Sequence, residues 1–261
     1  MNYPHVLYRA TQNHKHPLIF ATISGAHLYG FPSPDSDYDL RGCHVLPVEE
    51  LIGLDAPVET IESSSIDDGI ELDLVTHDAK KFFLMMMQKN GYVLEQLYSP
   101  LIIASTKEHD ELKEIAKKCI TRNHSHHYLG FALTQWRLFS KEEKPRVKPL
   151  LYVYRVLLTG INLMQTGLIE ANLVSLNEKF KLSYIPELIE QKLCGVEKQQ
   201  IKEADLGFHE SEYQRLRAWL EEEFERSKLP ETQNAKDDLD DLLRRVRTGK
   251  LTPNEVSHKG A

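Results

Sequence analysis

The chain shows two patterns of apolar residues, and the change between them falls near residue 105. Before that point, from LIFATISGAH (18–27) to GIELDLVTHD (69–78), apolar residues form short β-rich runs interrupted by Gly, Pro, Asp and Ser. This pattern is typical of strands joined by turns. After residue 106, apolar residues recur every three or four positions, as in KPLLYVYRVLLTGINLMQTG (148–167), which predicts long helices. We therefore predict an α+β protein with an α/β domain at 1–105 and an all-α domain at 106–261.

The last helix that the pattern predicts lies in DDLDDLLRRVRTGK (237–250). Its apolar residues share one face at three- and four-residue spacing, namely Leu239, Leu242, Leu243 and Val246. Because the other residues of this helix are mostly charged, the apolar face indicates a surface that packs against the rest of the protein. We expect a final docking helix here.

Length and composition are those of a globular protein of one or two domains. The chain has 261 residues, 41% of them hydrophobic, and a formal net charge of −7. The charge is uneven, because residues 1–105 hold 6 basic and 14 acidic side chains whereas residues 106–160 hold 11 basic and 6 acidic ones. A surface that binds a polyanion is thus expected only locally, in 106–160.

Cysteine use and the absence of apolar spans bear on localisation. The three cysteines are odd in number and far apart in the sequence, which argues against a disulfide framework and for a reducing compartment. The N-terminal residues lack a basic segment followed by an apolar run, and no stretch approaches the roughly 18 apolar residues that span a bilayer. These features predict a cytoplasmic protein with no membrane association.

The stretch GAHLYGFPSPDSDYDLRG (25–42) carries the candidate chemistry. Gly25 follows a predicted buried strand, so the backbone can turn there and approach a ligand closely, and the amides of the next residues suit a phosphate. Asp37 and Asp39 then share one face of an extended segment, because strand side chains alternate. Two aligned carboxylates favour Mg²⁺ or Mn²⁺. A phosphate-binding turn followed by a carboxylate pair predicts nucleotidyl transfer with metal ions.

Three other interpretations of the aspartates are weaker. A calcium loop of the EF-hand type fails, because its glycine position is Leu40 and its final glutamate position is Leu46. A solvated acidic turn does not account for the glycine turn upstream. The metal-binding Asp-x-Asp motif of glycosyltransferases does not call for that turn either.

Five segments resemble a known superfamily: SGAHLYG (24–30), DSDYDLRG (35–42), DLVTHDAKKF (73–82), KNGYVLEQL (89–97) and KPLLYVYRVLLTG (148–160). They are similar to the polymerase-β-like nucleotidyltransferases, and more narrowly to the RlaP family, the RNA-ligase-associated branch. The resemblance reaches across about residues 20–170. It implies a mixed β-sheet with flanking helices, followed by a helical domain, and an NTP as substrate.

The resemblance also implies roles for individual residues. Gly25 and the amide of Ala26 would hold phosphates, although the family usually has serine where this chain has Ala26, and Ser24 is placed to compensate. Asp37 and Asp39 would bind Mg²⁺ or Mn²⁺. The superfamily has a third carboxylate on a neighbouring strand. Periodicity allows Glu71 or Asp73, and the family pattern favours Asp73 with Glu71 in reserve.

Three basic residues are candidates for phosphate contacts. Lys148, Tyr152 and Arg155 lie at i, i+4 and i+7 of a predicted helix, so the two cations share a face that can meet a triphosphate or an RNA backbone. A salt bridge from Arg155 to the acidic first domain is an equal alternative. Arg41 is placed either to reach a phosphate or to orient Asp39.

The predicted function is that of an enzyme that transfers a nucleoside monophosphate from an NTP to an acceptor hydroxyl and releases pyrophosphate. The resemblance to RlaP suggests an RNA acceptor, such as a tRNA-like molecule or a damaged end, in RNA repair or processing. Two alternatives stay open: nucleotidylation of a protein or a small molecule, and a degenerate nucleotide-binding module without activity.

Overall fold

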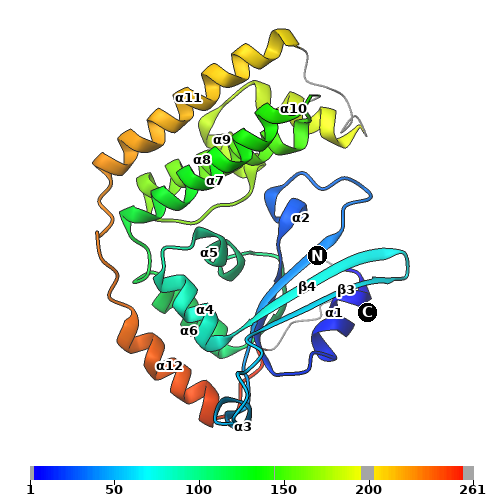
Figure 1. The fold of residues 1–261 in the computed structure, drawn as a ribbon, viewed down its shortest axis with the longest axis vertical. Coiled ribbons are helices and arrows are strands. Elements are labelled where there is room, and N and C mark those ends of the chain that lie inside the picture. Colours follow the sequence, from blue (N-terminus) through cyan, green and yellow to red (C-terminus); the bar gives the residue numbers. More distant parts are fainter. Residues whose placement is uncertain (1–2, 144, 195–202, 255–261) are drawn as a thin grey trace. The chain divides into compact units, whose positions relative to one another are not determined.

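The structure is a computed structural model that describes residues 3–143, 145–194 and 203–254 (Figure 1). These residues fall into two compact units. Unit 1 comprises the described residues of 1–25, 37–119 and 233–261, and unit 2 comprises those of 26–36 and 120–232. The units thus do not follow a single cut at residue 105, because residues 106–119 and the C-terminal helix group with the sheet, and residues 26–36 group with the helices.

Unit 1 contains a mixed five-stranded sheet in the order β3-β4-β2-β1-β5. The strands are β1 (Leu18–Ile23), β2 (Tyr38–His44), β3 (Thr60–Asp67), β4 (Ile70–Asp78) and β5 (Ile102–Ser105). β2 and β4 are parallel, and the other neighbouring pairs are antiparallel. β3 and β4 form a hairpin, drawn in cyan in Figure 1. The α+β class predicted from the sequence is confirmed.

Side-chain alternation decides which residues each strand presents. On β4, Leu72, Leu74 and Thr76 are buried on one face, so Glu71 and Asp73 lie on the other. β1 occupies the interior of the sheet between β2 and β5, and its residues from Ile19 to Ile23 are fully buried. This burial explains why LIFATI is apolar almost throughout.

Helices of unit 1 pack around the sheet. They are α1 (His5–Gln12), α3 (Val48–Leu51), α4 (Ala79–Met87), α5 (Gly91–Leu97), α6 (Lys107–Ala116) and α12 (Lys236–Thr248). α12 is the predicted docking helix, and it packs against α6 and α4 with Leu239, Leu242 and Val246 buried. Arg247 near its end pairs with Asp78, whose carboxylate caps α4 by accepting from the amide of Lys80.

Unit 2 is helical. It contains residues 26–29 of α2 (Gly25–Tyr29), the 3₁₀ turn η1 (Arg122–His124), α7 (Ser125–Lys141), α8 (Val147–Thr166), α9 (Leu173–Phe180), α10 (Tyr184–Leu193) and α11 (Glu203–Arg226). α8 is its central helix, since α7, α9, α10 and α11 all pack against it. Gly167 ends α8 in the left-handed conformation, with φ of +73°. Within the described ranges, no helix combines the length and apolar character needed to cross a bilayer.

Candidate active site

Asp39 on β2 and Asp73 on β4 lie directly opposite each other. They are partners in the register of the parallel strand pair, so their side chains leave the sheet on the same face at the same level. One guanidinium nitrogen, Nη2 of Arg41, donates to both carboxylates, at 2.6 Å to Oδ1 of Asp39 and 2.9 Å to Oδ2 of Asp73. The two predicted acidic residues are thereby joined through a single cation.

Arg41 is held in place from several sides. Its Nη1 atom donates to the backbone carbonyls of Leu40 and Asp73, at 2.9 and 2.8 Å, and its Nε atom donates to the hydroxyl of Tyr92 at 3.3 Å. The side chain is 12% exposed. Burial acts to lower the pKa of Arg41, but Tyr92 and the two aspartates outweigh it and raise the pKa. Of the two roles considered for Arg41 from the sequence, the contacts are those of a residue that orients Asp39.

Ser64 and Tyr92 belong to this cluster, and sequence reasoning did not identify either of them. Ser64 on β3 donates to Oδ1 of Asp73 at 3.0 Å. The sequence does contain a signal for Ser64. Asp68-Gly69 is a typical hairpin turn, and a hairpin with this turn pairs Ser64 with Asp73. Tyr92 lies on α5, and no local pattern connects that helix to β2.

The turn at Gly25 lies against Asp39. Gly25 has φ of +60°, and a side chain at this position would collide with the carboxylate of Asp39. The amide of Ser24 donates to the backbone carbonyl of Asp39 at 2.8 Å. The hydroxyl of Ser24 is buried and makes no hydrogen bond within the part of the chain that the structure describes, so a buried polar group lies beside the turn with its donor unused.

Asp37 is placed differently from the other two carboxylates. It precedes β2, which begins at Tyr38, and it is exposed. The ion pairs of Arg41 involve Asp39 and Asp73. Among residues 3–143, 145–194 and 203–254, no group of three or more His, Cys, Asp or Glu side chains is arranged to hold a metal ion. The structure thus joins Asp39 and Asp73 through Arg41, and a metal-binding role for Asp37 stays a prediction.

The segment between the turn and the aspartates packs on the helices of unit 2. The guanidinium of Arg155 lies 3.8 Å from the ring centroid of Tyr29, and Tyr152 meets the same ring edge to face at 5.4 Å. Gly30, with φ of +87°, approaches the amide of Asn172 so closely that a side chain would collide with it. Residues 26–36 are therefore positioned by α8 and by the start of α9.

A family model described as "RNA repair pathway DNA polymerase beta family" (RlaP) matches residues 4–245. The chain belongs to the RlaP family. The family assignment made from the sequence motifs is confirmed, and the match extends well beyond the segments that suggested it. It makes this protein a member of a polymerase-β-like nucleotidyltransferase family.

Relatives of this RlaP protein include two that carry no described activity. An uncharacterized protein of Methanocaldococcus jannaschii is 30% identical over 217 residues, which is 81% of this chain and 86% of that protein. The uncharacterized protein YcgL of Bacillus subtilis is 26% identical over 154 residues, 58% of each chain. A crystal structure of a nucleotidyltransferase-like protein from Exiguobacterium sibiricum aligns with a TM-score of 0.34 and 13% identity, covering 85% of this chain and 73% of that chain. This last similarity is too low to support an argument.

The donor groups of the RlaP site suit a hard divalent cation. Asp39 and Asp73 supply only carboxylate oxygens, the ligands that Mg²⁺ and Mn²⁺ prefer. The absence of a side chain at Gly25 leaves room for the carboxylate of Asp39 beside the turn. The pair therefore fits a metal ion chemically, and the guanidinium of Arg41 is the cation that lies between the two carboxylates in the structure.

The remaining predicted site residues lie in unit 2, which begins with Ala26. Ala26 is 7% exposed and Arg155 is 2% exposed. Lys148 at the start of α8 is exposed. Contacts of these residues with an NTP stay predictions.

Proposed function

We propose that this RlaP protein is a metal-dependent nucleotidyltransferase that moves a nucleoside monophosphate from an NTP to a hydroxyl at an RNA end and releases pyrophosphate. The observation that carries the proposal is the register pairing of Asp39 with Asp73, with the carboxylate of Asp39 against Gly25. The family description, which refers to an RNA repair pathway and to DNA polymerase beta, supports the acceptor and the reaction class.

In the proposed reaction, the acceptor oxygen forms a bond to the α-phosphorus as the bond to the pyrophosphate oxygen breaks. The carboxylate of Asp73 takes the proton of the acceptor hydroxyl, and pyrophosphate leaves with the bonding electron pair. Mg²⁺ or Mn²⁺, held by Asp39 and Asp73 with Asp37 as a further ligand, would supply positive charge against the triphosphate. Glu71 lies on the same face of β4, but the register pairs Asp73, and not Glu71, with Asp39.

The residues around the pair have supporting roles in this proposal. Arg41 positions Asp39 and Asp73 through its shared Nη2 atom. The buried hydroxyl of Ser24 and the amide of Ala26 would donate to phosphate oxygens beside Gly25. Ser24 would thus stand in for the serine that the family usually has at position 26.

The test uses each α-labelled NTP with Mg²⁺ or Mn²⁺ and bulk tRNA. We expect label on the RNA, and a loss of at least about 100-fold in D39N and D73N, because each removes a charged oxygen ligand. Glu71→Gln is the matched control. Glu71 lies on the same strand and the same face as Asp73, but it is exposed, and its register partner on β3 is Ile66.

Other outcomes of the same assay would overturn parts of the proposal. Label on the protein itself, or on an added small molecule, would reject the RNA acceptor and keep the transfer reaction. An NTP that binds without transfer under all conditions would reject the enzyme and indicate a degenerate module. Equal losses in E71Q and D73N would reject the assignment of Asp73.

A further inference from the structure

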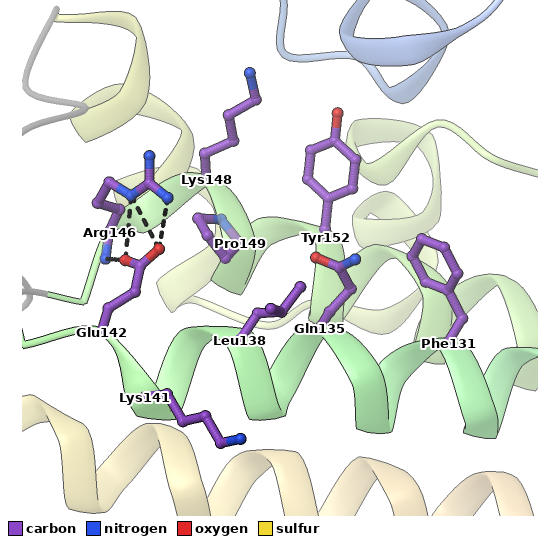
Figure 2. Close-up of a pocket in the computed structure, with 9 residues that line it drawn as sticks. All are labelled: Phe131, Gln135, Leu138, Lys141, Glu142, Arg146, Lys148, Pro149 and Tyr152. Atoms are coloured by element: carbon purple, nitrogen blue, oxygen red, sulfur yellow. Dashed lines mark hydrogen bonds and ion pairs between the residues drawn. The ribbon is translucent and has the colours of Figure 1, made fainter.

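A groove runs between α7 and α8 in unit 2, with a volume of about 540 Å³ (Figure 2). Its α7 side is formed by Phe131, Gln135 and Leu138, whose spacing of four and three residues places them along one face of the helix, and by Glu142 just after the helix ends. Its α8 side is formed by the first turns of that helix, including Tyr152. All of these residues belong to one compact unit, so the groove is a feature of the helical unit itself.

Apolar surface is exposed in the groove, and the half-buried rings of Phe131 and Tyr152 line it. Leu138 is 55% exposed, although it lies in the middle of the groove wall. Figure 2 shows the amide of Gln135 directed toward Tyr152, with Phe131 one turn closer to the N-terminus of α7. This part of the groove offers a ring, an aliphatic side chain and an amide that can both donate and accept hydrogen bonds.

Cations gather at the other part of the groove. Lys148 and Arg146 lie at the start of α8, and Figure 2 shows the side chain of Lys141 on the opposite side of α7, directed away from both. Arg146 binds the carboxylate of Glu142 through two nitrogens, at 2.5 Å from Nη2 and 3.0 Å from Nε. The hydrogen bond from Arg146 lowers the pKa of Glu142, so this carboxylate stays ionised and balances the charge of Arg146, which leaves the positive charge of Lys148. The groove therefore has an excess of positive charge.

We propose that this groove binds one nucleotide of a single-stranded RNA, with the base against Tyr152, Leu138 and Gln135 and the phosphate at Lys148. A nucleotide joins a flat, hydrogen-bonding base to an anionic phosphate, and the groove presents these two chemistries in its two parts. Stacking on aromatic side chains together with a cationic groove is the usual mode of binding for single strands. The excess of basic residues in 106–160 agrees with it.

The identification of the bound strand as the RNA that accepts the NMP rests on the proposed function. Binding itself does not depend on catalysis. An acidic peptide could pair with the cations, but it has no flat base to stack on Tyr152 and to hydrogen-bond with Gln135. RNA is therefore the occupant that both parts of the groove favour.

The first experiment measures binding of a labelled single-stranded RNA of about 12 nucleotides in EDTA without NTP, by fluorescence anisotropy. Leu138→Glu places a negative charge in the groove at an exposed position, and Lys148→Glu reverses one cation. We expect each to weaken binding about tenfold or more, and K148E also to reduce the salt dependence. Leu168→Glu and Lys228→Glu are matched controls, because both residues are exposed, lie in unit 2 and do not line the groove.

The second experiment locates the strand. RNA that carries 4-thiouridine should cross-link to peptides of α7 and of the start of α8, and L138E should abolish this cross-link. Cross-links that map elsewhere, controls that lose as much affinity as L138E and K148E, or polyglutamate that competes as well as RNA would each overturn the proposal. The thermal unfolding midpoint of L138E should equal that of the wild type, which shows that a loss of RNA binding does not come from unfolding of the variant.

The two proposals fail in different ways. If RNA binds in the groove but D39N and wild type show no NMP transfer, only the proposed function is rejected. If wild type transfers NMP to RNA and L138E does so with unchanged affinity, only the groove is rejected.

Discussion

The carboxylate of Asp39 lies against the Cα atom of Gly25, in the space that a side chain on residue 25 would fill. Gly25 also has φ of +60°, a conformation that L-amino acids with a side chain seldom adopt. The amide of Ser24 fixes the same approach by its hydrogen bond to the carbonyl of Asp39. One glycine thus meets a backbone and a packing requirement at the point where the turn meets the acidic pair.

Gly25→Ala should therefore reduce both stability and activity. Gly69 at the β3–β4 turn has a similar φ of +75°, but nothing lies within 4 Å of a side chain there. We expect Gly69→Ala to lower the free energy of unfolding by about 1 kcal/mol and G25A to lower it further. G25A should also lose at least about 100-fold in NMP transfer, because Asp39 must move. Urea denaturation and the transfer assay measure the two effects, and equal behaviour of the two variants would contradict the argument.

Arg41→Gln should leave two carboxylates facing each other without a shared cation. Asp39 and Asp73 are 23% and 36% exposed, respectively, so we expect the free energy of unfolding in EDTA to fall by about 1–3 kcal/mol. Mg²⁺ or Mn²⁺ should recover part of this loss in R41Q, because a divalent cation replaces the guanidinium.

The double variant R41Q/D73N is the control for the Arg41 prediction. It lacks one of the two repelling charges, so it should be more stable than R41Q in EDTA and should respond less to Mg²⁺. The test is the thermal unfolding midpoint of both variants, measured with and without Mg²⁺. A stabilisation by Mg²⁺ that is the same in both variants would place the metal elsewhere.

Arg247→Gln should destabilise unit 1 far more than a typical surface substitution. Its pair with Asp78 is buried, with side chains 9% and 1% exposed, and the variant leaves a buried carboxylate without its counterion. We expect the free energy of unfolding to fall by about 3–5 kcal/mol. Arg244→Gln on the same helix breaks the exposed pair with Asp240, and it should change the free energy by about 0.5 kcal/mol or less. Similar midpoints in urea for the two variants would refute this role of α12.

Acid should destabilise the protein through two buried histidines. Burial lowers the pKa of His44 to about 3 and that of His109 to about 4. Both groups are neutral in the folded protein and take up protons more readily when unfolded, so their contribution is complete above pH of about 6.5 and is lost as the pH falls toward the folded pKa values. Each should contribute a slope of about 1.4 kcal/mol per pH unit within that window.

Urea denaturation between pH 8 and pH 4.5 tests the histidine prediction. The free energy of unfolding should be nearly flat above pH 7 as far as these groups are concerned, and His44→Gln should reduce the slope below pH 6.5. An unchanged slope in H44Q would show that other groups cause the acid sensitivity.

The candidate site was partly predictable from the sequence because its first half is local. The run LIFATIS, the glycine after it and the extended segment at Asp39 lie close together in the chain, and strand alternation and turn chemistry apply to them directly. Asp37 shows the limit of this reasoning. Alternation assigned it to the face of Asp39, yet β2 begins only at Tyr38 and Asp37 is exposed before it.

The choice between Glu71 and Asp73 depends on a long-range register. Both residues lie on one face of β4, so periodicity treats them alike. The parallel pairing of β2 with β4 places Asp73 opposite Asp39, and the antiparallel pairing with β3 places Ser64 beside it. The position of Arg41 two residues after Asp39 allowed a role in orienting Asp39, but its contacts with Asp73 and Tyr92 form only after the sheet and α5 have packed.

The sequence by itself determined the α+β class, the turn at Gly25 and the amphipathic stripe of α12, because periodicity and turn preference depend on residues a few positions apart. It also indicated the family, through the resemblance of its motifs. Only the tertiary structure decided which carboxylates meet, that Arg41 lies between them, and that residues 26–36 and 233–254 belong to different units from their chain neighbours. These features depend on which distant segments share a core, and the free energy of that choice is summed over many contacts that no local pattern records.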